Sequence, residues 1–115
     1  MGKEIELFTG DDWEAGITIG NEGSGPFDAS GGTAQASVVR LDKSAPIPLI
    51  DAITQNEGAT GADWANGLIV AEFPRASTEL VNFTGQAFIF IKTTKDGKEK
   101  TWPAVPVTVK KGPIG

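Results

Sequence analysis

Turn residues interrupt this chain so often that only short elements of secondary structure fit between them. It contains 15 glycines and 7 prolines in 115 residues, well above the roughly 12% that these two residues contribute to an average protein. The runs between them are rich in β-branched and aromatic side chains, and several alternate between apolar and polar residues. Short β-rich runs separated by dense turns predict an all-β fold, either a sandwich or a barrel.

The length is that of one domain, and we expect a single β-sandwich domain over residues 1–115. Hydrophobic residues make up 39% of the chain, which is enough for one modest core but leaves little for a large internal cavity. No apolar run approaches the roughly 20 residues that a membrane-spanning helix needs. The first residues are charged and lack the apolar core of a signal peptide, so we expect synthesis in the cytoplasm and no membrane partner.

The N-terminal half contains a long glycine-rich loop flanked by predicted strands. This loop, residues 20–33, has one large apolar side chain, Phe27, which we expect to pin the loop to the core. Pro46 and Pro48 place the last strand of this half at a sheet edge, because proline cannot donate to a central ladder. The predicted strands of this half are residues 3–8, 17–19, 34–41 and 46–50.

The C-terminal half carries the clearest strand pattern. Residues 86–92 are predicted to be a central sandwich strand, because they contain the continuous apolar run 87–91, and Asp96-Gly97 predicts a type I′ hairpin turn. The polar stretch 51–66 is predicted to be a loop with one turn of helix, and Ser77 is expected to cap a helical turn at 77–81. The other predicted strands of this half are residues 68–73, 99–102 (ended by Pro103) and 105–109.

The charge is acidic and unevenly distributed. The formal net charge is −5, which disfavours nucleic acid because phosphate binding needs clustered lysine and arginine. Residues 1–30 sum to −6, whereas residues 93–115 sum to +3. These blocks are compatible with two arrangements: electrostatic steering of head-to-tail assembly, or strands of one sheet that pair with each other through weak exposed ion pairs.

The residue types exclude most enzyme chemistry near neutral pH. The chain has no histidine, cysteine or tyrosine, so it lacks the usual proton shuttle and thiolate nucleophile. Clustered carboxylates suggest acid–base catalysis or calcium binding, but they coincide with turns, no EF-hand spacing is present, and no helix follows the glycine-rich loop to cradle a phosphate. We therefore predict no catalytic, cofactor-binding or metal-binding residue. The carboxylates and amides weighed were Asp11, Asp12, Glu14, Asn21, Glu22, Asp28 and Asp63.

Three tryptophans are the large aromatic residues outside the plain strand core. We assign Trp102 to the core, because a small sandwich normally buries at least one tryptophan. Trp64 lies in a polar loop next to Asp63, where it serves either loop packing or a contact surface. The predicted interaction residues are Trp64, Asp63, Phe27 and Trp13.

The order of these signals resembles the small immunoglobulin-like domain of bacteriophage tail and baseplate proteins, of the kind that opens baseplate upper proteins. Its pattern combines a Gly-Asp turn, a Gly-x-x-Asp-x-(Ser/Thr)-Gly loop, Gly-led strands, an Asp-Gly-Lys hairpin and a strand ending Val-x-Val. The matching residues are Gly10-Asp11, Gly25 to Asp28 with Ser30-Gly31, Val38 to Arg40, Gly67 to Val70, Thr78, Gly85 to Ile91, Asp96-Gly97-Lys98 and Val107-Thr108-Val109.

The resemblance implies an immunoglobulin-like antiparallel β-sandwich of about seven strands and a non-catalytic role in assembling the phage or prophage particle. The partners would be other virion proteins, the chain would form a homo-oligomer in the particle, and its location would be the virion. Two other functions fit the residues. One is a carbohydrate-binding or adhesin-type sandwich that stacks sugars on exposed Trp64 and Trp13, and the other is a hydrolase that uses carboxylates.

Overall fold

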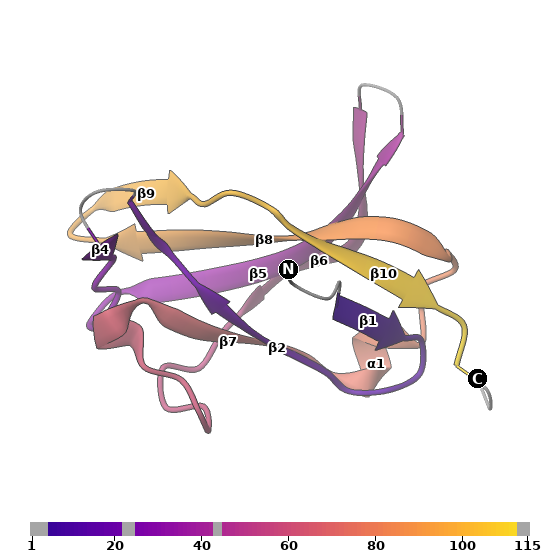
Figure 1. The fold of residues 1–115 in the computed structure, drawn as a ribbon, viewed down its shortest axis with the longest axis horizontal. Helices are drawn as coiled ribbons and strands as arrows, with labels where there is room; N and C mark the ends of the chain where they lie inside the picture. The colour runs from indigo at the N-terminus through magenta and orange to yellow at the C-terminus, as the bar shows by residue number, and fades with distance from the viewer. Residues whose placement is uncertain (1–4, 22–24, 43–44, 113–115) are drawn as a thin grey trace.

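The fold consists of two β-sheets that lie face to face around one hydrophobic core, together with a short β-ribbon (Figure 1). The structure is a computed structural model that describes residues 5–21, 25–42 and 45–112. The larger sheet has the strand order β1-β10-β8-β5-β6, and β9 pairs with β8 beyond the end of β10. Its strands are β1 (Ile5–Phe8), β5 (Thr33–Asp42), β6 (Ala45–Thr54), β8 (Gly85–Lys95), β9 (Lys98–Thr101) and β10 (Val105–Lys110).

The smaller sheet consists of two antiparallel strands that cover the inner face of the larger one. These are β2 (Trp13–Thr18) and β7 (Leu68–Phe73). Two-residue strands β3 (Gly20–Asn21) and β4 (Gly25–Pro26) form the ribbon that follows β2. The helical segments of the described residues are one 3-10 turn, η1 (Trp64–Asn66), and one short helix, α1 (Arg75–Thr78).

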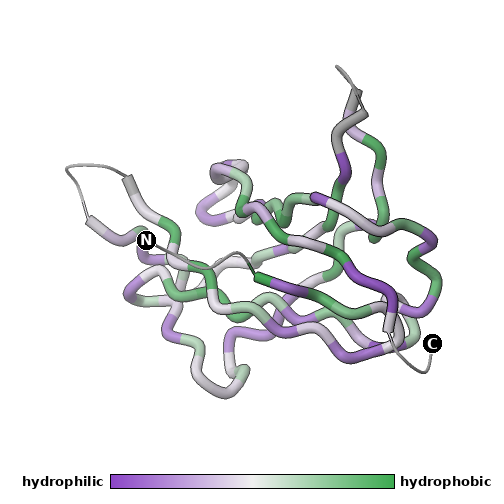
Figure 2. Tube along the Cα trace, turned by 45° about the vertical axis from the view of Figure 1, so that its right-hand side comes forward, coloured by the Kyte–Doolittle hydropathy of each residue, from purple (hydrophilic) through white to green (hydrophobic). Residues whose placement is uncertain are grey.

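Strand β8 is the central strand of the larger sheet, and it has apolar side chains on both of its faces. Ala87, Ile89 and Ile91 are buried in the core, whereas Phe88 and Phe90 lie half-buried on the outer face. Such a continuous apolar run is typical of a strand with neighbours on both edges, and β8 indeed lies between β5 and β10. In β2, by contrast, buried and exposed residues alternate strictly, and Figure 2 shows hydrophobic and hydrophilic residues interspersed along the chain.

The all-β prediction is confirmed, and most predicted strands occur within one or two residues of their expected positions. Strand 68–73 is observed with the predicted bounds. Both turn residues of the predicted hairpin have positive φ, 54° at Asp96 and 77° at Gly97, as a type I′ turn requires. Strand β6 lies at a sheet edge, as its prolines predicted, and Pro103 lies in the break between β9 and β10.

The prediction of a purely antiparallel arrangement is wrong for the larger sheet. Strand β1 pairs parallel to β10, so this sheet is mixed. A sequence cannot show this directly, because the two strands are almost a hundred residues apart and each alternates in the same way whichever direction its neighbour runs. The described residues contain ten strand segments rather than about seven, since β3 and β4 are short and β9 and β10 are separate.

Three local predictions also need correction. The second strand begins at Trp13, not at residue 17, because Trp13 and Ala15 continue the inward alternation of β2. Strand β6 runs on to Thr54, four residues into the predicted polar loop. It does so because its pairing with β5 continues from Ala45 to Thr54. Ser77 is not a helix cap, since helix α1 begins after Pro74, whose ring offers no side-chain capping hydrogen bond.

The two oppositely charged ends of the sequence pair with each other within the fold. Glu6 and Lys110 form an ion pair of 2.5 Å across the parallel pair β1–β10. Lys95 lies 3.6 Å from the carboxylate of Asp28, which again joins the acidic N-terminal block to the basic C-terminal block. These contacts bear out the second of the two arrangements considered above, although such exposed pairs contribute little to stability.

Candidate interaction site

Three segments that are distant in sequence meet at one end of the molecule, which we call the loop end. They are residues 25–32, residues 57–67 and the β8–β9 hairpin (residues 93–102), on the left of Figure 1. The Ala29 amide donates to the Trp64 carbonyl at 2.9 Å, and the Lys95 ammonium donates to the Asp28 carbonyl at 2.8 Å. The first of these segments is therefore joined to both of the others.

A tryptophan at the base of the hairpin organises this end. Trp102 is 2% exposed, and its Nε1 donates to the buried hydroxyl of Thr93 at 3.0 Å. The Phe27 ring packs against the indole with 4.9 Å between ring centroids. Lys100 Nζ also lies 4.3 Å from the Trp102 ring centroid, within the range of a cation–π interaction. The predictions that Trp102 belongs to the core and that Phe27 pins its loop are confirmed.

Asp28 shapes the first of the three segments. Its Oδ1 accepts hydrogen bonds from the hydroxyl and the backbone amide of Ser30, an Asx-type turn. These two bonds, the hydroxyl bond first, lower the pKa of the Asp28 carboxyl below 3.8, and nearby Lys95 adds to the effect. The carboxylate is thus negative at neutral pH; it closes the turn at Ser30 and lies 3.6 Å from the Lys95 ammonium of the hairpin.

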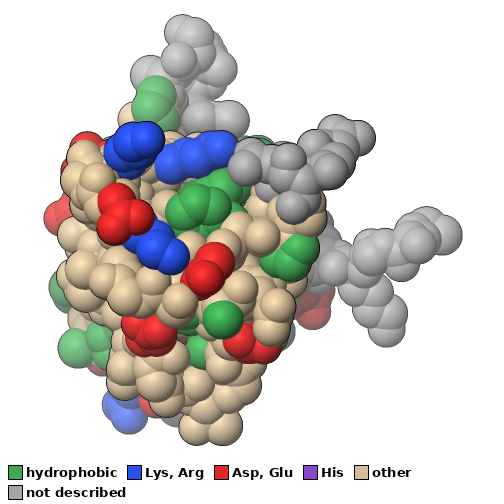
Figure 3. Space-filling view, turned by 90° about the vertical axis from the view of Figure 1, so that its left-hand side faces the viewer, with side chains coloured by type: hydrophobic (Ala, Val, Ile, Leu, Met, Phe, Trp, Pro, Cys, Tyr) green, Lys and Arg blue, Asp and Glu red, His purple; other side chains and the backbone are tan. Residues whose placement is uncertain are grey.

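The surface of the loop end is hollowed and carries charges of both signs. A hollow of about 520 Å³ lies between the first segment and the hairpin. Figure 3 views this end of the molecule and shows lysine or arginine side chains next to acidic ones, with hydrophobic surface between them. The lining residues are Phe27, Asp28, Thr93, Lys95, Asp96, Lys98, Glu99 and Lys100.

Trp64 belongs to the loop end but not to its surface. It is 3% exposed, so the prediction that it forms part of an exposed contact surface is wrong, and the loop-packing alternative holds. Its Nε1 has no hydrogen-bond partner among the described residues. The neighbouring Asp63 is exposed and accepts a hydrogen bond of 2.8 Å from the Asn66 side chain, as a turn residue does.

Trp13 lies at the other end of β2, away from the loop end. It is 3% exposed, and its Nε1 donates to the Phe8 carbonyl at 2.6 Å. Its ring meets Phe73 edge-on, with 6.2 Å between centroids. The structure therefore brings Phe27, Asp63 and Trp64 to one end of the molecule and separates them from Trp13, which is a core residue.

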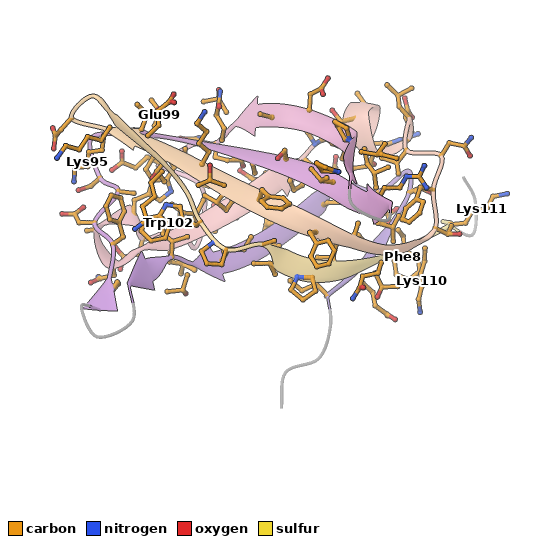
Figure 4. All side chains as sticks on the ribbon, turned by 90° about the horizontal axis from the view of Figure 1, so that it is seen from above. Phe8, Lys95, Glu99, Trp102, Lys110 and Lys111 are labelled. Atoms are coloured by element: carbon orange, nitrogen blue, oxygen red, sulfur yellow. The ribbon has the colours of Figure 1, made fainter. Side chains whose placement is uncertain are left out.

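The sequence interpretation missed the lysines of the hairpin. Lys95 directly precedes the Asp96-Gly97 turn, and Lys98 and Lys100 follow it. All three lysines line the hollow. Figure 4 shows Lys95, Glu99 and Trp102 together at one end of the molecule and Lys110 and Lys111 at the other. Charged residues beside the predicted hairpin could have indicated this surface. The same pattern is equally typical of the solvent-exposed face of an ordinary strand.

The remaining acidic residues, considered above for catalysis or calcium binding, do not form a common site among the described residues. Asp12 accepts a hydrogen bond of 2.7 Å from the Arg75 amide, and the Asp11 carbonyl accepts one of 2.6 Å from the buried Thr78 hydroxyl. Glu22 lies outside the described residues. Among the described residues, no three acidic side chains gather as a metal site would require.

Comparison with known proteins assigns no family to the chain. No protein-family model matches it, and no curated protein matches it significantly. In the part of the chain that the structure describes, no helix is long and apolar enough to cross a membrane.

Proposed function

We propose that this chain is a non-catalytic structural module of a bacteriophage or prophage particle, which binds other virion proteins through its loops and strand edges. It would be made in the cytoplasm of the bacterial host and act in the virion. The observation that carries the proposal is the loop end, where three segments meet through hydrogen bonds and two of them, residues 25–32 and the hairpin, enclose a hollow lined by charges of both signs. Loops held on a rigid β-framework are a common way to present a protein-binding surface.

The strand order supports an immunoglobulin-like arrangement. With β2, β5, β6, β7, β8 and β10 taken as strands B, C, C′, E, F and G, the sheets match the C′-C-F-G order and the B-E pair of a variable-type domain. The loop end then corresponds to the end of such a domain at which the B–C and F–G loops meet. No disulfide joins the two sheets, since the chain contains no cysteine.

The two rival functions have less support. A sugar-stacking platform needs exposed aromatic rings, whereas Trp13 and Trp64 are each 3% exposed. A hydrolase needs two carboxylates across a substrate cleft, whereas Asp12 accepts a hydrogen bond from the first amide of α1 and Asp28 accepts one from the amide of Ser30 in its own turn. The mixed charges of the loop end favour a protein partner, because such a surface is matched by complementary charges on another protein.

The test of this function is whether the protein is part of the particle. The chain, tagged and expressed in its host, should sediment with density-purified particles and be detected in them by mass spectrometry. Lys98→Glu should reduce this incorporation, because Lys98 lines the hollow of the loop end. Lys111→Glu is the matched control, since it makes the same charge change at the opposite end (Figure 4). Absence of the unmodified chain from purified particles would refute the proposal.

A further inference from the structure

Two residues of β7, Leu68 and Glu72, have hydrogen-bond partners for their backbone groups on the outer edge of the strand. Leu68 exchanges two backbone hydrogen bonds of 2.9 Å with Asp63. The Glu72 amide donates to Gln55 Oε1 at 2.7 Å, and the Gln55 side chain donates in turn to the Glu72 carbonyl at 3.4 Å. Leu68 and Glu72 therefore direct their backbone groups away from β2. This determines which opposite pairs of the β2–β7 ladder exchange hydrogen bonds and which do not.

It follows that alternate residues of β2 direct their backbone groups to an open edge. In an antiparallel pair, directly opposite residues either exchange hydrogen bonds or both point outward, in alternation. Thr18 and Glu14 lie opposite Leu68 and Glu72, so they point away from β7, and Gly16 between them does so too. The Ile19 amide donates to the Gly67 carbonyl, which agrees with this phase. No described strand pairs with the outer edge of β2.

The other open edges carry proline, lysine or a short described length, and β2 has none of these three features. Strand β6 has Pro46 and Pro48, β9 has Lys98 and Lys100, and the described part of β1 spans four residues. Prolines, lysines and short length are the usual means by which proteins protect sheet edges. Strand β2 has six residues, no proline and no lysine, and Gly16 at its centre has no side chain.

We propose that β2 of a second copy of this chain occupies this edge, antiparallel and related by a two-fold axis at Gly16. This inference rests on the proposed function, because it supplies the homo-oligomer expected in the particle. In this register Gly16 faces Gly16, Glu14 faces Thr18 of the second copy, and Ala15 faces Ile17. No carboxylate opposes another across the new pair, and inward residues face inward residues. The two small sheets would join into one of four strands, a self-complementary interface.

A charge pair at Thr18 tests the register. Thr18 is exposed, so Thr18→Glu and Thr18→Lys should both fold, which thermal melts will check. In the dimer, Glu at position 18 would face Glu14 twice by symmetry, and we expect the dimer Kd to rise roughly two- to thirtyfold. Lys at position 18 would face the same carboxylates and should leave the Kd unchanged or lower. Sedimentation equilibrium from about 1 μM to about 1 mM covers the range of weak dimers.

A monomeric parent chain over that range would overturn the proposal, and so would equal effects of the two Thr18 variants. Gly16→Pro removes an amide that the monomer does not use and should abolish the dimer. Gly16→Ala is its control, because the added Cβ would meet only the Leu68 side chain at an ordinary 3.6 Å. If the proline variant does not fold, the Thr18 pair remains decisive.

The experiments separate this inference from the proposed function. A monomer that is nevertheless found in purified particles refutes the two-fold pairing and leaves the virion role standing. A dimer that is absent from particles refutes the virion role and leaves the pairing standing. A Gly16 amide that becomes protected from hydrogen exchange only when another virion protein is added would place a foreign strand on this edge, which also refutes the pairing.

Discussion

The indole nitrogens of Trp102 and Trp64 provide a matched test of hydrogen bonding in this core. Both side chains are buried, with 2% and 3% exposed. Trp102 Nε1 donates to Thr93 Oγ1 at 3.0 Å, whereas Trp64 Nε1 has no partner within the described part of the chain. Changing either residue to phenylalanine removes the same atoms from a buried site, so the packing losses should be similar.

The two variants should therefore differ by their hydrogen bonds. Trp102→Phe leaves the buried hydroxyl of Thr93 without its donor, which costs about 1–3 kcal/mol. Trp64→Phe removes a donor that is buried without a partner, which recovers about 1–3 kcal/mol. We expect Trp102→Phe to lower the free energy of unfolding by at least about 2 kcal/mol more than Trp64→Phe, a large share of the 5–15 kcal/mol typical of a domain.

Urea denaturation followed by far-ultraviolet circular dichroism measures both values without relying on tryptophan fluorescence. The control is Thr93→Val combined with Trp102→Phe. Removing both partners of a buried hydrogen bond should cost less than the sum of the two single changes. Equal destabilisation by Trp64→Phe and Trp102→Phe, or strict additivity in the double variant, would show that these hydrogen bonds do not differ as the structure indicates.

Three further predictions follow from exposed residues and turns. Glu14 lies directly across from a second glutamate on the smaller sheet, so Glu14→Lys should raise the free energy of unfolding by about 0.2–1 kcal/mol, and a gain that persists in 1 M salt would contradict the electrostatic cause. Gly67→Ala should be more destabilising than Gly10→Ala in thermal or urea unfolding. Both glycines have positive φ, but a Cβ at Gly67 would lie 2.4 Å from a backbone oxygen, whereas a Cβ at Gly10 would meet nothing within 4 Å. Similar losses of stability in the two variants would exclude the close contact. The hydrogen bonds from Ser30 depress the pKa of Asp28 in the folded state, so they stabilise the fold at neutral pH. This contribution is lost as the pH falls from about 4 through the lowered pKa. The difference in the free energy of unfolding between the parent chain and Asp28→Asn should therefore shrink over that range, and a constant difference would exclude the linkage.

Local sequence was sufficient to predict the turns and the strongest strands. The hairpin at Asp96-Gly97 could be predicted because a type I′ turn needs two residues that tolerate positive φ, whatever the rest of the fold. Residues 86–92 and 68–73 could be predicted as strands because their apolar runs are short, β-branched or aromatic, and bounded by glycine or proline. Two parts of the candidate site followed from sequence: Phe27 as the anchor of its loop and Trp102 as a core residue.

Tertiary structure decided everything that depends on contacts between distant segments. The burial of Trp64 and Trp13 could not be predicted, because a tryptophan in a polar or turn-rich stretch has the same local sequence whether it faces the core or water. The pairing of β1 with β10 and the edge protection by Gln55 join residues that no local pattern relates. Sequence thus determined which short segments are extended and where the chain turns, since backbone preferences act over a few residues. The packing of two sheets decided which side chains are buried, which loops meet and which edge remains open, because those outcomes depend on the whole chain at once.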